Sequence, residues 1–526
     1  MKVLVVTGGL LTEKETSVWR ALRKSARQWR ASEHAWLDLK IKLVFAEMLA
    51  SKPRRAAGEN SPPDLTEVVL ATLLHQQGVP YVLATYDDLF ARPDWAARQL
   101  AECDCVLAST TFLRDLSEVE PLVKMLKRPH NRIVLGGPLA GILDDRWEGM
   151  PEVDVLAAGY GEFLVPALVE WMRSDYATLE APPGGRVVRK RHTTIVYSGV
   201  PPTQDLDFLP TPDWALSQRD RSRRYRMIYY ESVRGCPYRC NFCNYPYLFA
   251  DSRFRYKSAR RMLEEWERYL AGLDVEYITC LDSLFTMPRR RLEEFCRGLI
   301  ERRTRVKWIC YARADDLADP SIAALMREAG AHQVQIGLES GDQGQLDNMD
   351  KACSVESNAR AIDNCRRFGI TSVVSLIVGF PGETAGTLER TYEFMRAHPP
   401  DFYFLATFST RATGVPVMNE YNRRRFDLRT VADLKTAAPY WSHRTMTCGE
   451  AGNHVRELHR RLMREGVSLN AALFFDRMLD FRPEDRAALL ARQQTMAHRP
   501  VLAKVFDRLN RFVDRRIASD VSESLA

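Results

Sequence analysis

The first third of the chain alternates short apolar runs with stretches of helical periodicity. Residues 3–7 form an apolar run that ends in a threonine and is followed by two glycines. Runs of this kind are typical of strands buried on both faces of a parallel sheet. We expect a doubly wound sheet, which binds ligands at the carboxyl ends of its strands. Its further strands are predicted at 81–84, 105–111, 132–137 and 153–159, and its helices at 65–76 and 116–127.

A second series of strand and helix patterns begins at residue 255. The helix predicted at 255–270 carries Met262, Leu263, Trp266 and Leu270 on one face. Parallel strands covered by helices predict an open or closed barrel. The other helices are expected at 292–301, 321–329 and 359–367, and the strands at 275–281, 306–313, 333–341, 372–383 and 402–406.

Three charged residues stand where strands of this second series end. Asp282, Arg313 and Glu339 follow or close the predicted strands at 275–281, 306–313 and 333–341. Ligands of parallel α/β folds bind at these carboxyl ends, so the three side chains are candidate ligand contacts. The alternative is that they cap the following helices or pair with one another.

Composition is that of a soluble globular protein. The chain has 526 residues, of which 45% are hydrophobic and 27% charged. No run approaches the ~18 consecutive apolar residues of a membrane span. The N-terminus lacks the features of a signal peptide, which predicts a cytoplasmic protein.

The net charge of +7 (75 − 68) is spread along the chain and predicts no nucleic-acid partner. Its basic clusters are short and lack interleaved aromatic residues, so we interpret them as solvated faces. An anionic substrate or cofactor is still compatible with this charge.

Eleven cysteines in a chain without an export signal argue against a disulfide framework. Cys236, Cys240 and Cys243 are distinctive, because they are spaced by four and three residues on one short segment. Three such thiolates can hold three irons of a [4Fe–4S] cluster and leave the fourth iron open. Structural zinc requires four ligands, and neither a second cysteine pair nor a nearby histidine completes such a set. The segment therefore predicts a cluster whose open iron binds a small molecule.

The Cys-x-x-x-Cys-x-x-Cys segment resembles the motif of the radical S-adenosylmethionine (SAM) enzymes. The resemblance implies that SAM chelates the open iron through its methionyl amine and carboxylate. One electron from the reduced cluster then releases a 5′-deoxyadenosyl radical. Phe242 matches the family's aromatic residue, whose backbone lies beside the adenine; simple packing is the alternative interpretation.

Later segments look like those of cobalamin-dependent radical SAM enzymes: residues 281–285, 312–315, 336–341 and 378–384. Carried over residue by residue, the resemblance implies that Asp282, Arg313 and Glu339 contact the methionine or ribose part of SAM. It also implies that Gly379 lets the backbone approach the adenine, as a residue without a Cβ can.

The N-terminal third resembles the cobalamin-binding domain that precedes the barrel in these enzymes. The resemblance rests on ordered segments at 109–111, 136–141 and 159–162, and the first predicted strand carries no Gly-x-Gly-x-x-Gly motif of a dinucleotide site. A lone Gly-Gly-Pro would more often be a turn. The implied cobalamin contacts are Ser109, Thr110, Thr111, Gly136, Gly137, Pro138, Gly159, Gly161 and Glu162.

Two features of this sequence depart from what is usual in cobalamin-binding proteins. The Asp-x-His-x-x-Gly motif that gives cobalt a histidine in many cobalamin proteins is absent. Tyr160 occupies a position where the family often has glutamate.

The predicted fold class is α/β, with four parts. A doubly wound, Rossmann-like cobalamin-binding domain spans 1–175, with a helical insertion at about 10–62. A linker with a small basic hairpin spans 176–215. A radical SAM (β/α)6 partial TIM barrel spans 216–420, and a C-terminal helical region spans 421–526.

The resemblance covers about residues 1–420 and implies a cobalamin-dependent radical SAM methyltransferase. Such an enzyme transfers a methyl group from SAM through methylcobalamin to an unactivated carbon of a small-molecule, natural-product or peptide substrate. It also implies an electron donor such as flavodoxin or ferredoxin. The alternatives are cyclisation, rearrangement or oxidation without methyl transfer, methylation of an aromatic carbon or phosphorus without hydrogen abstraction, and a non-catalytic sensor.

Overall fold

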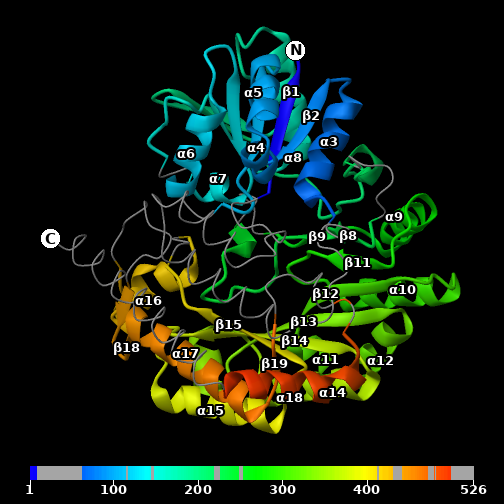
Figure 1. The fold of residues 1–526 in the computed structure, drawn as a ribbon, viewed down its shortest axis with the longest axis vertical. Coiled ribbons are helices and arrows are strands. Elements are labelled where there is room, and N and C mark those ends of the chain that lie inside the picture. Colours follow the sequence, from blue (N-terminus) through cyan, green and yellow to red (C-terminus); the bar gives the residue numbers. More distant parts are fainter. Residues whose placement is uncertain are drawn as a thin grey trace.

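The computed structural model contains two α/β units that follow one another along the chain (Figure 1). The predicted α/β fold class is thereby confirmed. All but Pro62 of the predicted insertion at about 10–62 lies outside the described residues, as does the end of the C-terminal region. The described residues are 1–8, 62–113, 116–143, 147–217, 225–247, 253–410, 414–430, 441–471, 479 and 481–498.

The N-terminal unit is a seven-stranded sheet in the order β2-β1-β3-β4-β5-β7-β6. All neighbouring strands are parallel except the edge pair of β6 and β7. Every residue of β1 and β3 is buried, as their apolar runs predict. The strands are β1 (Val3–Thr7), β2 (Tyr81–Thr85), β3 (Cys105–Ser109), β4 (Arg132–Gly136), β5 (Val155–Ala158), β6 (Arg186–Lys190) and β7 (Thr193–Tyr197).

Helices cover both faces of this sheet, which makes it doubly wound. Side chains of α4 to α7 share one apolar cluster with one face, and those of α3 and α8 share another cluster with the opposite face. The β6–β7 hairpin, which the sequence placed in the linker, extends the sheet beyond β5. The helices are α3 (Leu65–Gln76), α4 (Tyr86–Ala91), α5 (Pro93–Glu102), α6 (Leu116–Leu126), α7 (Pro138–Leu143) and α8 (Gly161–Arg173).

The second unit is a parallel sheet in the order β19-β15-β14-β13-β12-β11-β8. In chain order its first strand is β8, which was not anticipated from the sequence, and its last strand is β19, which comes from the C-terminal region. The other five match the predicted strands with shifts at their ends, the largest in β14, which ends at Val378 rather than at the predicted residue 383. The strands are β8 (Met227–Tyr230), β11 (Tyr277–Cys280), β12 (Lys307–Arg313), β13 (Ala331–Glu339), β14 (Thr371–Val378), β15 (Phe402–Thr407) and β19 (Leu469–Asn470).

The helices of this unit pack on one face of its sheet and enclose the largest apolar cluster. The prediction of a helix from residue 255 was wrong at its start. Arg255 and Tyr256 form β10, which pairs with β9 (Val233–Arg234), and Ser258 caps the helix that follows. The helices are α9 (Ala259–Gly272), α10 (Arg289–Glu301), α11 (Ala314–Leu317), α12 (Pro320–Glu328), α13 (Gln343–Asn348), α14 (Val355–Phe368) and α15 (Ala385–Ala397).

The C-terminal region is only partly helical. It contributes a small antiparallel sheet as well as β19, and α17 packs against α15 and β15. Among the described residues, no helix is long and apolar enough to cross a membrane. The elements are η3 (Pro416–Met418), α16 (Glu420–Phe426), β16 (Arg429–Thr430), β17 (Trp441–His443), β18 (Met446–Thr447), α17 (Cys448–Glu465), η5 (Pro483–Asp485) and α18 (Arg486–Ala497).

The segment between the two units contacts both of them. The amide of Asp213 donates to Thr72 Oγ1 on α3 over 2.8 Å. Ser258, the cap of α9, donates from its amide and its hydroxyl to the Asp207 carboxylate, over 2.7 and 2.6 Å. Trp214, from the short helix η1 (Trp214–Ser217), is 1% exposed and shares the large apolar cluster with Val68 of α3. The two units are therefore packed together rather than joined by an open tether.

Candidate functional site

The three motif cysteines lie on the loop that follows β9. All three are free thiols: Cys240 is buried, and Cys236 and Cys243 are half-buried. Burial raises the pKa of each thiol, that of Cys243 to about 11. Within the described part of the chain, no three His, Cys, Asp or Glu side chains are close enough to hold one metal ion. A cubane does not require such convergence, because each thiolate binds a different iron.

Backbone contacts fix this loop against the barrel. The amide of Asn241 donates to Met349 O over 2.8 Å, and its side chain donates to Asn348 O over 2.8 Å. Its carbonyl accepts from the amide of Val417 over 2.9 Å. Gly235 has φ +78°, and a Cβ there would lie 2.2 Å from Arg253 O, so only glycine fits. These protein contacts hold the loop against the second unit.

Two buried cations stand beside the cysteines. Arg313 places Nη1 4.0 Å from Cys240 Sγ and stacks its guanidinium 3.7 Å from the centre of the Tyr238 ring. Lys351 pairs with Glu339 over 3.2 Å, with both side chains less than 10% exposed. Burial alone would lower the pKa of Lys351, but the Glu339 carboxylate raises it, so the ammonium stays charged.

This donor set fits a [4Fe–4S] cluster. Three thiols on one anchored loop supply the sulfur ligands, and the two cations offset the negative charge that thiolates and cluster carry. Glu339 also has φ +65°, a strained conformation for a residue with a Cβ. Backbone strain of this kind is common at functional sites.

Arg313 and Glu339 lie at the carboxyl ends of β12 and β13, as the sequence predicts. In this structure the guanidinium of Arg313 also donates to Asp315 over 2.9 Å and to the carbonyl of Lys351 over 2.6 Å. Pairing with neighbours was the alternative interpretation of these residues. Their contacts with SAM remain predictions.

The Asp282 carboxylate accepts hydrogen bonds from Ser232 and Val233, at the start of the segment that leads to the cysteines. It is 1% exposed and accepts from Ser232 N over 2.6 Å, Ser232 Oγ over 2.5 Å and Val233 N over 2.8 Å. Burial raises the pKa of Asp282 to about 6. The carboxylate therefore supports the segment before the cysteine loop, and its predicted contact with SAM remains a prediction.

Gly379, at the end of β14, is covered by the C-terminal region. It has φ +87°, and a Cβ would lie 2.6 Å from Ala451 Cβ and 2.8 Å from Trp441 Cη2. His443 Nε2 lies 3.2 Å from its carbonyl oxygen. Glycine is therefore required here by the protein's own packing, and the predicted approach of the adenine is not tested by this geometry.

Phe242 packs edge-on against Phe380, with ring centroids 6.3 Å apart. Phe380 in turn contacts Phe408 and Phe426. This aromatic cluster accords with the packing interpretation of Phe242. Its predicted place beside the adenine concerns the backbone and remains a prediction.

Glu383 is a buried carboxyl group that accepts a hydrogen bond from the amide of Gly379. Burial raises its pKa to about 8. The native state therefore binds this proton more tightly than the unfolded chain, and stability falls as the pH rises from about 4.5 through about 8. Glu383→Gln is expected to flatten the pH dependence of the free energy of unfolding over this range, measured by urea denaturation.

Part of the slope should remain in Glu383→Gln at the acidic end, because Asp282 also has a raised pKa. The opposite result is a free energy of unfolding of the variant that changes with pH between 6 and 8 as steeply as that of the unaltered protein, within about 0.3 kcal/mol per pH unit. That result would contradict the raised pKa of Glu383.

The predicted Ser-Thr-Thr segment closes the carboxyl end of β3. Thr110 donates from its amide and its hydroxyl to Gly136 O, over 2.7 and 2.8 Å. The hydroxyls of Ser109 and Thr111 lie 2.8 Å apart. These bonds join the ends of β3 and β4, which brings two of the three predicted cobalamin segments side by side.

The glycines predicted to contact cobalamin lie at the ends of β4 and β5. Gly137 and Gly159 have φ +102° and +112°, a region that strongly favours glycine. Gly161 begins α8 and has open space where a Cβ would be. Gly136 ends β4, and Pro138 is the first residue of α7. The sheet thus gathers all three predicted segments at one edge, while their contacts with cobalamin remain predictions.

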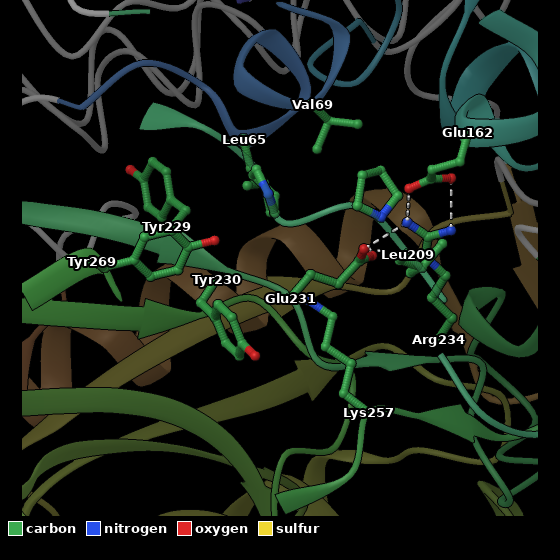
Figure 2. Close-up of a pocket in the computed structure, with 12 residues that line it drawn as sticks. Leu65, Val69, Glu162, Leu209, Tyr229, Tyr230, Glu231, Arg234, Lys257 and Tyr269 are labelled. Atoms are coloured by element: carbon green, nitrogen blue, oxygen red, sulfur yellow. Dashed lines mark hydrogen bonds and ion pairs between the residues drawn. The ribbon is translucent and has the colours of Figure 1, made fainter. Parts of the chain in front are cut away.

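Glu162, at this edge, pairs with Arg234, which precedes the cysteine loop; Figure 2 shows the pair. Its two carboxylate oxygens accept from Arg234 Nη1 and Nη2 over 3.0 and 2.7 Å. Arg234 also donates from Nη2 to Glu231 over 2.8 Å. We call these three residues the interdomain ion triad. Arg234 and Glu231 were not anticipated from the sequence, because nothing in their own segment identifies a partner on a distant helix.

The class of the second unit follows from a comparison with protein families. Residues 230–395 match the family model of the radical SAM superfamily. The match includes the three cysteines and the strand ends at Asp282, Arg313, Glu339 and Gly379. This part of the chain is a radical SAM domain, whose cofactors are a [4Fe–4S] cluster and SAM.

Individual related proteins align with longer parts of this chain than the family model does. The chain is 31% identical over 265 residues to the anaerobic magnesium-protoporphyrin IX monomethyl ester cyclase of Rubrivivax gelatinosus, covering 48% of this chain and 46% of the relative. It is 26% identical over 364 residues to the cobalamin-dependent radical SAM methyltransferase TokK of Streptomyces tokunonensis, covering 64% and 52%. The chain spans about half the length of these relatives.

The fold also resembles a solved structure. The radical SAM methyltransferase TsrM of Kitasatospora setae, solved with cobalamin and a [4Fe–4S] cluster bound, superimposes with a TM-score of 0.61. The match covers 94% of this chain and 99% of that chain at 16% identity, which shows a shared fold. With TokK, it confirms the predicted resemblance to cobalamin-dependent radical SAM enzymes.

Proposed function

We propose that this protein is a cobalamin-dependent radical SAM methyltransferase that acts on a carbon of a small-molecule or peptide substrate. One observation carries the proposal. The edge of the N-terminal sheet that gathers the predicted cobalamin segments is bonded to the loop of the three cysteines through Glu162 and Arg234. A corrin at that edge would therefore lie next to the cluster and SAM.

The chain's own residues hold and shape this site. Cys236, Cys240 and Cys243 are the cluster ligands, and Arg313 and Lys351 balance the charge beside them. When bound, the cluster and cobalamin supply the one-electron and methyl-transfer chemistry. The protein orients the substrate between them and excludes water from the reacting centre.

A second candidate function is cyclisation with the same cofactors and no methyl transfer. The observation in its favour is the relative from Rubrivivax gelatinosus, which is named as a cyclase and is 31% identical over 265 residues. The methyl-transfer proposal is favoured by the fold match to TsrM over 94% of this chain. A flavodoxin or ferredoxin is the electron donor that we propose for either reaction.

Anaerobic reconstitution tests the proposal. The protein is loaded with iron, sulfide and hydroxocobalamin, desalted, and incubated with SAM and titanium(III) citrate. We expect the protein to retain a corrinoid and to release 5′-deoxyadenosine, both measured by liquid chromatography with mass spectrometry. Protein that retains no corrinoid would contradict the proposal, and so would protein that leaves SAM intact.

Products separate the two candidate reactions. With a substrate, methyl transfer yields S-adenosylhomocysteine together with a product that is heavier by one methylene. Cyclisation yields 5′-deoxyadenosine without S-adenosylhomocysteine.

A further inference from the structure

The interdomain ion triad connects two segments that the proposed chemistry requires at a fixed separation. Arg234 is two residues before Cys236, and Glu162 directly follows Gly161 at the start of α8. Figure 2 shows the dashed contacts from Arg234 to both carboxylates, above Lys257 and beside Leu209 of the connecting segment. Few covalent bonds thus separate the ion pair from the cluster ligand on one side and from the predicted corrin loop on the other.

The ion pair of Arg234 and Glu162 is buried and bidentate. Both side chains are shielded from solvent, with 7% of Arg234 and 8% of Glu162 exposed. Two parallel N–H···O bonds fix distance and angle together, unlike a single contact. The guanidinium also lies 4.9 Å from the centre of the Tyr160 ring, which sits between Gly159 and Gly161.

The positive charge of Arg234 keeps the Glu162 carboxyl group ionised. Burial alone would raise the pKa of Glu162, but the adjacent Arg234 guanidinium brings it below its ordinary value. Both carboxylates of the triad face one guanidinium, so removing that cation would leave the buried Glu162 carboxylate without its partner and next to the half-buried Glu231 carboxylate.

The backbone of Arg234 is also fixed. It lies in β9 and pairs with Arg255 of β10. Arg234 therefore belongs to a paired strand that leads directly into the cysteine loop.

We propose that Arg234 is a positioning residue that sets the separation between the cysteine loop and the corrin edge. The inference rests on the proposed function. It predicts that Arg234 is needed for the step that joins both cofactor sites, the methylation of cobalamin by SAM. Reductive cleavage of SAM takes place at the cluster alone and needs Arg234 less.

In the methylation of cobalamin by SAM, the methyl–sulfur bond of SAM breaks, and cob(I)alamin supplies both electrons of the new cobalt–carbon bond. S-adenosylhomocysteine leaves with the electron pair of the broken bond. Titanium(III) citrate supplies the electrons that form cob(I)alamin beforehand.

The test uses the full chain with Arg234→Lys, which keeps the positive charge and removes the planar fork. We expect 5′-deoxyadenosine formation and cobalamin retention to stay within about twofold of the unaltered protein. The rate of S-adenosylhomocysteine formation should fall about tenfold or more, because small displacements between reacting groups are costly in rate. Glu162 is itself an implied cobalamin contact, so for Glu162→Gln both rates are taken per bound cobalamin. S-adenosylhomocysteine formation should then fall about tenfold relative to 5′-deoxyadenosine formation, and this variant replaces Arg234→Lys if the latter does not fold.

A spectroscopic measurement reports the separation without turnover. Cob(II)alamin and the reduced cluster are both paramagnetic, so their magnetic coupling broadens the cobalamin electron paramagnetic resonance signal according to distance. This broadening should change in Arg234→Lys and in Glu162→Gln. A purely structural salt bridge would lower stability without changing the broadening.

Arg461→Lys is the matched control. Arg461 makes a bidentate pair with Glu389, but neither residue lies in the N-terminal unit: Arg461 is on α17 of the C-terminal region and Glu389 is on α15. It should leave both rates and the broadening unchanged. Equal losses of SAM cleavage and cobalamin methylation in Arg234→Lys would overturn the inference, and so would an unchanged broadening. Failure of the unaltered protein to retain cobalamin would instead refute the proposed function and the inference with it.

Discussion

Cys240→Ala is expected to abolish the brown iron–sulfur absorbance and to lower reductive SAM cleavage by at least ~10³-fold. Cys240 is the middle cysteine of the loop and the most buried of the three, at 7% exposed. Without it the loop offers two thiols, and SAM then has no stably held iron on which to bind. The measurements are iron and sulfide content, visible absorbance and 5′-deoxyadenosine after anaerobic reconstitution.

Cys448→Ala is the control for Cys240→Ala. Cys448 is also a free, partly buried thiol, but it begins α17 and lies outside the motif. It should retain the full iron content and SAM cleavage. If Cys240→Ala keeps its colour and its cleavage activity, the assignment of the loop as the cluster site is wrong.

Gly159→Ala is expected to destabilise the N-terminal unit by roughly 2–4 kcal/mol. Gly159 has φ +112°, and a Cβ would lie 2.2 Å from Ser198 Oγ. That hydroxyl accepts the amide hydrogen of Tyr160 over 2.9 Å, so moving it also breaks this bond. Urea denaturation monitored by circular dichroism measures the loss.

Gly161→Ala is the matched variant two residues away. Gly161 lacks a positive φ and has no atom within 4 Å of the position of a Cβ. The free energy of unfolding should stay within about 0.5 kcal/mol of the unaltered protein. If the corrin lies against this loop, as the resemblance implies, the added methyl group should still weaken cobalamin retention.

The two glycine variants therefore separate folding from binding. Stable Gly161→Ala protein with undiminished cobalamin retention would remove Gly161 from the cobalamin site. Undiminished stability in Gly159→Ala would contradict the close approach of Ser198.

The sequence predicted several helices and strands of the two units well. The helix α3 (Leu65–Gln76) has the predicted bounds and β12 ends at the predicted Arg313, whereas β13 ends at Glu339, before the predicted end at residue 341. Buried parallel strands are read from uninterrupted apolar runs, which local sequence shows directly. The short strand β8 carries two tyrosines in four residues and lacks that signature.

Other features depend on contacts between distant segments. The β6–β7 hairpin lies in the segment predicted as a linker, and Arg186, Val187 and Arg189 of β6 are exposed, yet β7 pairs with β5. The two residues of β19 join the barrel sheet through β15, more than sixty residues earlier in the chain. Edge pairing of this kind uses backbone bonds, which leave little trace in residue type.

The sequence alone determined the cysteine motif, the class of chemistry that it implies and the order of the two sheets. Spacing along one loop and hydrophobic period are local properties, so they can be read without coordinates. Only the tertiary structure decided that Trp441 and Ala451 cover Gly379, and that Glu162 pairs with Arg234 seventy-two residues away. Glu162 and Arg234 meet only because the two units pack together, and a buried charge is stable only where the fold brings it an opposite charge.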